Sequence, residues 1–96
     1  MKSPAEIKAL YVKHYIRPKR YTAVIDPEDR SCCVLGIMYY DKLGKTFPEH
    51  GHTDQLGEAL GLTFKETVDI QAGFDGGHSN SEMQAWGAAV AKECFQ

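Results

Sequence analysis

The hydrophobic positions near the start of the chain recur at helical spacing. They fall at i, i+3, i+4, i+7 and i+8 and so share one face of a helix: Ile7, Leu10, Tyr11, His14 and Tyr15. Ser3 is a favourable N-cap and Pro4 suits the first helical position. Because Pro18 cannot continue a helix, we predict a first helix over residues 5–16.

The last third of the chain predicts two more helices, over residues 64–72 and 81–93. Thr63 and Glu66 have the spacing of a capping box, in which each side chain binds the other residue's backbone N–H. Gly73 is expected to end the first of these helices. The second carries a hydrophobic stripe at helical spacing, made of Met83, Trp86, Val90 and Cys94.

The middle of the chain is less decisive. The segment SCCVLGIMYYDKLGKTF (residues 31–47) is either a buried helix or a hairpin turning through DKLG, and periodicity does not separate the two. Residues 21–25 read as a short strand, and DQLGEAL as a short helix ending at Gly61. We predict a mainly α fold with at most one short β hairpin, formed from residues 21–25 and 34–47. An α+β fold is the alternative.

Length and composition place the chain among small globular proteins. Its 96 residues predict a single domain over 1–96, too small for a core plus a large active-site cleft. No apolar run approaches the ~20 residues of a membrane span, and the first ten residues lack the apolar core of a secretory signal. We therefore expect a cytoplasmic protein that does not bind a membrane.

The three cysteines favour buried thiols over chemistry. An odd count that includes the adjacent pair Cys32 and Cys33 does not build a disulfide framework, and no Cys-x2-Cys pair offers a zinc site. No histidine lies near the pair in sequence to activate a catalytic thiol. We predict that the protein is not an enzyme.

Charge is unevenly distributed along the chain. Residues 1–20 hold six basic side chains and one acidic one, a net of +5, whereas the rest holds five basic and twelve acidic, a net of −7. Aromatic and basic residues alternate where the first helix is expected to end, a composition typical of interface hot spots. We predict a partner-binding site there, made of Tyr15, Arg17, Lys19, Arg20 and Tyr21. Aromatics among cations also occur in single-stranded nucleic acid binders, which is the alternative partner class.

The segment FPEHGHTD raises the question of a metal site. His50, His52 and Asp54 are ligand types that zinc or iron accepts, and they resemble the start of the His-x-His-x-Asp-His motif of metallo-β-lactamase-type hydrolases. Position 55 is Gln where that motif has its last histidine. We therefore predict no metal and no cofactor, and expect a solvated loop followed by a helix capped by Thr53 or Asp54.

Two segments carry a resemblance to a family. RSCCVLG followed by LGLTFKETVDIQAGFDGG and an Ala-rich last helix resembles small uncharacterised phage and bacterial proteins with a Cys-(Cys/Ala)-x-Leu-Gly segment. The resemblance covers roughly residues 30–92 and implies that the cysteine segment is a buried helix. It also implies a phage or mobile-element accessory protein that acts by binding, and thereby inhibiting, a host protein. The basic segment near residues 15–21 predicts that this partner has an acidic contact surface. The alternative is a small nucleic-acid-binding or metal-binding protein.

Overall fold

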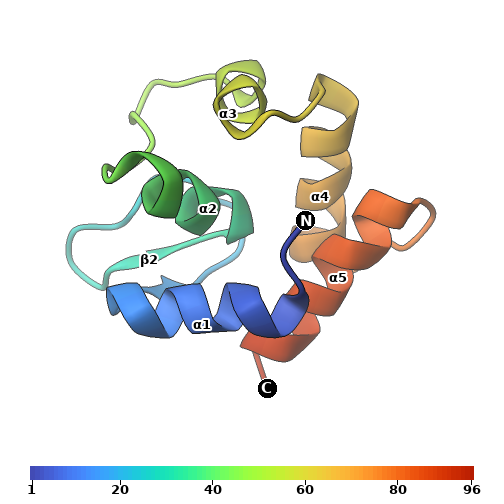
Figure 1. Cartoon of the computed structure of the whole chain (residues 1–96), viewed down its shortest axis with the longest axis horizontal. Coiled ribbons are helices and arrows are strands. Elements are labelled where there is room, and N and C mark those ends of the chain that lie inside the picture. Colours follow the sequence, from blue (N-terminus) through green and yellow to red (C-terminus); the bar gives the residue numbers. More distant parts are fainter.

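The computed structural model describes residues 1–96 and shows five helices with one pair of very short strands (Figure 1). The mainly α prediction is confirmed. In chain order the elements are α1 (Pro4–His14), β1 (Arg17–Pro18), β2 (Ser31–Cys32), α2 (Val34–Leu43), α3 (Thr53–Leu60), α4 (Phe64–Gly76) and α5 (Glu82–Cys94). In Figure 1, α1 crosses the lower edge of the molecule near the C-terminus, and α3 lies at the opposite edge.

Three of the five helices, α1, α4 and α5, begin at a serine or threonine cap. Ser3 and Glu6 form a capping box at α1, and Thr63 and Glu66 form the predicted one at α4. α5 is capped by Ser81, whose hydroxyl accepts the backbone N–H of Gln84 at 3.1 Å. Because each cap satisfies N–H groups that have no partner within the helix, these starts follow from local sequence. The prediction that Thr53 or Asp54 caps α3 is wrong, because the N-cap is His52, whose backbone N–H donates to the Gln55 side chain at 2.9 Å.

The longest helices, α4 and α5, pack with their backbones in contact. A β-carbon on Gly73 would overlap the carbonyl oxygen of Gln84, and one on Gly87 would overlap that of Ile70. The prediction that Gly73 ends its helix is therefore wrong. α4 runs on to Gly76, and the left-handed residue that ends it is Gly77, with φ of 72°. Gly73 serves close helix packing instead.

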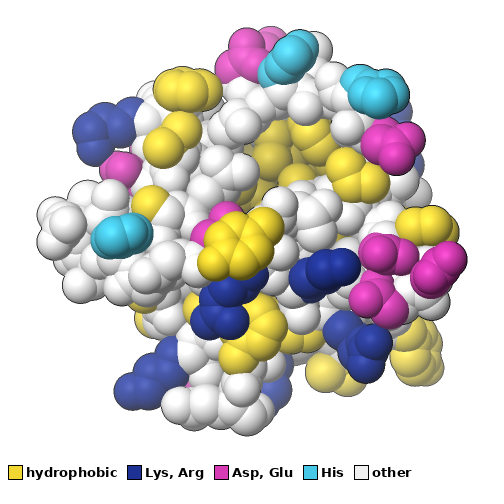
Figure 2. Space-filling model, turned by 180° about the vertical axis from the view of Figure 1, so that it is seen from behind, with side chains coloured by type: hydrophobic (Ala, Val, Ile, Leu, Met, Phe, Trp, Pro, Cys, Tyr) yellow, Lys and Arg dark blue, Asp and Glu magenta, His cyan; other side chains and the backbone are white.

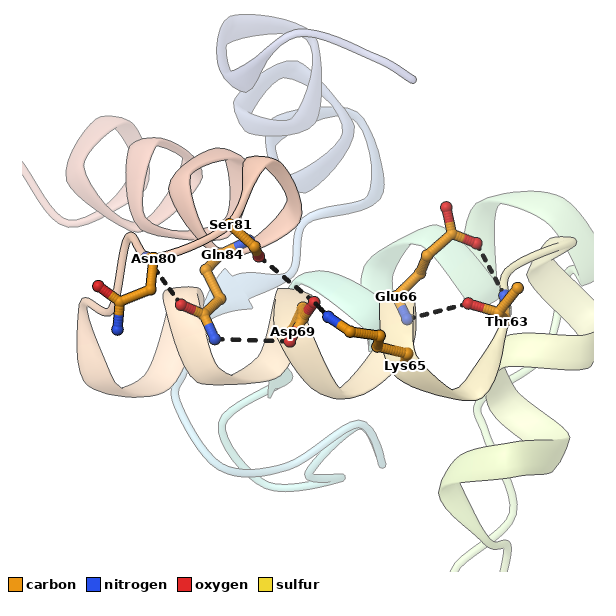
Figure 3. Close-up of polar contacts among 7 residues, drawn as sticks. All are labelled: Thr63, Lys65, Glu66, Asp69, Asn80, Ser81 and Gln84. Carbon is orange, nitrogen blue, oxygen red and sulfur yellow. Dashed lines mark hydrogen bonds and ion pairs between the residues drawn. The ribbon is translucent and has the colours of Figure 1, made fainter.

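Asp69 links these two helices through polar contacts (Figure 3). Its carboxylate pairs with Lys65 at 2.8 Å along α4 and accepts the Ser81 hydroxyl at 3.3 Å and the Gln84 amide at 3.4 Å. The ion pair with Lys65 is the main reason that the pKa of Asp69 lies below its usual range. These contacts fix the start of α5 against the middle of α4.

The ambiguous middle segment forms a helix, α2, in agreement with the helical alternative. The prediction of at most one short hairpin holds, because no hairpin forms: the only strand pair is parallel and joins Arg17–Pro18 to Ser31–Cys32. The predicted strand at residues 21–25 is irregular chain that runs over α2, where a β-carbon on Gly36 would overlap the carbonyl oxygen of Ala23. Tertiary contact with α2 thus overrides the β propensity of that run.

The core lies between all five helices. Its fully buried side chains are mainly aliphatic and aromatic, the largest being Phe74, Ile7, Leu35, Ile37, Leu56 and Ile70. Two of the three cysteines, Cys32 and Cys33, are also buried. The buried Tyr11 hydroxyl donates to the carbonyl oxygen of Cys32 at 2.8 Å, which joins α1 to β2.

Replacing Gly73 with alanine tests the helix contact. We expect Gly73→Ala to lower the free energy of unfolding by about 1–3 kcal/mol, because the added methyl forces the α4 and α5 backbones apart. Gly76→Ala is the matched control in the same helix, since its β-carbon meets only the side chain of His78. Urea unfolding should show the loss for Gly73→Ala alone, and equal stabilities would contradict the close contact.

Candidate functional site

The predicted binding residues cluster at a corner where the chain leaves α1. The side chains of Tyr15 and Tyr21 are 86% and 79% exposed, and Arg17, Lys19 and Arg20 are also exposed. We call residues 15–21 the basic corner. All five predicted residues are exposed, but Tyr15 and Arg17 line one hollow of the surface, whereas Lys19, Arg20 and Tyr21 line another.

Both tyrosines of the basic corner have left-handed backbone conformations. Tyr15 ends α1 with φ of 56°, and Tyr21 has φ of 74°. This region is unfavourable for residues with a β-carbon by roughly 1–2 kcal/mol, and glycine is the usual residue there. An exposed aromatic side chain recovers little of that energy by packing, so Tyr15 is not explained by stability.

Backbone hydrogen bonds to the segment before α2 hold the basic corner in place. The Arg17 N–H donates to the Arg30 carbonyl at 2.8 Å, and the Lys19 N–H donates to the Cys32 carbonyl at 3.0 Å. The Arg30 guanidinium donates to the carbonyls of His14 and Tyr15, at 3.2 and 3.3 Å. These last two bonds satisfy carbonyls that the end of α1 leaves unpaired.

The charges of the basic corner are not equally available. Lys19 lies 3.7 Å from Asp26 and 3.9 Å from Asp29. Arg20 lies over the ring of Phe95, 4.1 Å from its centroid, and donates to the Phe74 carbonyl at 3.2 Å. Arg17 alone has no ion pair or side-chain hydrogen bond within the chain. The Tyr21 backbone N–H and hydroxyl are also engaged, both with Asp75.

Next to Arg17 the surface is hollowed into an apolar groove of about 440 Å³. We call it the α1 groove; its lining is Lys8, Tyr11, Val12, Tyr15, Ile16, Arg17, Pro18 and Cys94. Val12 is 69% exposed, and neither cation has an ion-pair partner in the chain. The sequence analysis did not include Lys8 and Val12 among the binding residues. Val12 could have been found, because a hydrophobic residue outside the core-facing stripe of its helix indicates an exposed apolar surface.

The distribution of charge over the surface agrees with a basic end. In the lower part of Figure 2, which is the end that carries α1, lysine and arginine side chains alternate with hydrophobic ones. Acidic side chains gather mainly at the top and right of that view. Two of the acidic residues, Asp69 and Asp75, are held by contacts within the chain.

The histidines and cysteines considered for metal binding or catalysis do not form a site in the structure. His50 and His52 are exposed, Asp54 lies in the first turn of α3, and no three His, Cys, Asp or Glu side chains gather to hold a metal ion. Burial raises the pKa of the Cys33 and Cys94 thiols to about 11. At neutral pH these thiols are protonated and therefore weak nucleophiles.

One polar pair near the basic corner joins α1 to α2. His14 Nε2 lies 2.9 Å from the Asp41 carboxylate, and Lys13 Nζ lies 3.8 Å from it. The hydrogen bond with His14 is the largest cause of a lowered pKa at Asp41. Because the His14 ring also meets the edge of Tyr40, with centroids 5.1 Å apart, this pair positions the end of α1.

Comparison with family models, curated proteins and solved structures gives no match. No helix of the chain is long and apolar enough to cross a membrane. The basic corner and the α1 groove are the surface features that bear on function.

The backbone at Tyr15 gives a stability prediction. We expect Tyr15→Gly to be about 1 kcal/mol more stable than Tyr15→Ala, because only glycine adopts this left-handed conformation without strain. We also expect Tyr15→Gly to be at least as stable as the natural protein, since the side chain is almost fully exposed. Urea unfolding of the three proteins measures both differences, and a Gly variant less stable than the Ala variant would contradict the strain.

The two arginines of the basic corner should differ in their effect on stability. Arg20→Glu should lower the free energy of unfolding by about 1 kcal/mol, because it removes the contact with Phe95 and the hydrogen bond to Phe74. Arg17→Glu should change it by no more than about 0.5 kcal/mol, since Arg17 has no partner in the chain. Thermal and urea unfolding compare them, and equal effects would show that the Arg20 contacts contribute nothing.

Proposed function

We propose that the protein is a non-catalytic binding protein whose basic corner and α1 groove contact an acidic surface on another protein. The observation that carries the proposal is Tyr15, an exposed aromatic residue at a strained position beside the unpaired Arg17. Strained residues persist where function needs their side chains. Tyrosine and arginine are also the residues that dominate binding energy at interfaces.

The partner's chemistry follows from the charges that remain available. Lys8 and Arg17 line the α1 groove together, and no acidic residue lines it. Opposite charge on a partner would speed association with this surface and orient it. A basic protein would be repelled by the same residues.

The source of the partner follows from the family resemblance. Small phage or mobile-element proteins of the kind described above are expected to act on a host, so the proposed partner is a host protein that is occluded and thereby inhibited. The proposal assigns the chain no reaction, because burial raises the pKa of Cys94, the one thiol in the α1 groove, to about 11, and no histidine or carboxylate lines the groove to activate it.

Site-specific crosslinking tests the proposal. With p-benzoylphenylalanine at position 15, we expect one discrete adduct with an acidic host protein, because this side chain is central to the proposed contact. The matched control places the same group at position 64, where Phe64 is 61% exposed on α4. Equal adducts from both positions, or none from position 15, would contradict the proposal.

Charge reversal then tests whether the adduct reports a real interface. Arg17→Glu should weaken binding of the purified partner at least ten-fold, and Asp→Lys or Glu→Lys changes in the partner's contact should restore it. Lys45→Glu makes the same charge change in the exposed loop after α2 and should have little effect. A single-stranded oligonucleotide that binds more tightly than any protein would overturn the assignment in favour of nucleic acid.

A further inference from the structure

The α1 groove combines an apolar lining with cations contributed by two elements. Lys8 and Val12 lie at i and i+4 on an exposed face of α1, and Tyr15, the left-handed residue that ends this helix, joins them in the lining. Arg17 belongs to β1, and Cys94 ends α5. Because Tyr11 and Ile16 are each only 3% exposed, they contribute a fixed apolar wall.

The groove is suited to a side chain and unsuited to an added strand. β1 pairs with β2 on one side, and Pro18 has no N–H to offer a further strand. A partner segment therefore gains little from backbone pairing here. It can gain from placing an apolar side chain beside Val12 and Ile16, since burying that surface is favourable.

We infer that the α1 groove binds a short acidic segment of a partner protein by taking one apolar side chain between Lys8 and Arg17. Carboxylates on either side of this anchor would meet the two cations, and the ring of Tyr15 would cover it. The inference rests on the proposed function and adds the form of the ligand: an apolar anchor with acidic flanks.

Peptide titration followed by amide NMR tests the ligand class without knowledge of the partner. The probe is a short peptide with one central leucine between pairs of glutamates, compared with a peptide that has glycine in place of leucine. We expect the leucine peptide to bind at least about ten-fold more tightly. Its largest amide shifts should fall in residues 8–18 and at Cys94.

Matched variants separate the anchor from the charges. Val12→Ser should weaken the leucine peptide about five-fold or more and leave the glycine peptide unchanged, whereas Arg17→Glu should weaken both. Leu43→Ser and Lys45→Glu make the same changes at exposed positions outside the groove and should have little effect. Because Val12 and Arg17 are exposed, these variants should fold, which unfolding curves confirm.

Three results would overturn the inference: equal binding of the two peptides, shifts that map outside the groove, or equal effects of Arg17→Glu and Lys45→Glu. Its failure is distinguishable from that of the proposed function. If the crosslinked partner depends on Tyr15 and Arg17 but not on Val12, the proposed function stands and the anchor does not. If position 15 gives no adduct while the leucine peptide binds in the groove, the ligand class stands and the partner assignment falls.

Discussion

The carbonyl oxygen of Cys32 is the point on which the arrangement of the N-terminal half depends. It accepts the buried Tyr11 hydroxyl at 2.8 Å and the Lys19 backbone N–H at 3.0 Å. One acceptor therefore joins α1, the basic corner and β2, the strand that leads into α2. Burial strongly raises the pKa of Tyr11, so its hydroxyl remains a donor at physiological pH. Losing this bond would leave a buried polar group unpaired and would release the corner from the core.

The basic corner combines a backbone fixed by hydrogen bonds with two tyrosines in strained conformations. The backbone around it is fixed by hydrogen bonds from Arg17, Lys19 and Arg30, yet Tyr15 and Tyr21 occupy conformations that glycine would adopt more easily. The hydrogen bonds of Tyr21 to Asp75 offset part of its backbone strain, whereas the Tyr15 side chain makes no hydrogen bond in the chain. A rigid backbone that presents an unsupported aromatic side chain is pre-organised for contact, since little freedom is lost on binding.

The sequence predicts the helices well because their signals are local. The caps at Ser3 and Thr63 mark helix starts, and Gly61 ends α3 as expected. Glycine both ends helices and permits close helix packing, so the sequence alone does not show which role Gly73 has. The contact with α5 shows that it serves packing. The parallel pairing of residues 17–18 with 31–32 was beyond prediction for a similar reason, since two-residue strands leave no periodic pattern.

The sequence also does not show which charged side chains the fold pairs with one another. That pairing affects which class of partner the surface suits. Six cations in residues 1–20 indicate a strongly basic surface, but the fold pairs Lys13 and Lys19 with carboxylates and places Arg20 over Phe95. Of the three cations that remain, Lys8 and Arg17 line the α1 groove and Lys2 lies outside it, so the groove can neutralise about two phosphates. For single strands that gives a slope of log K against log salt of only about −1.4, well short of proteins that bind through many phosphate contacts. Few free cations with apolar area beside them thus support the proposed protein segment over a polyanion as the ligand of this surface.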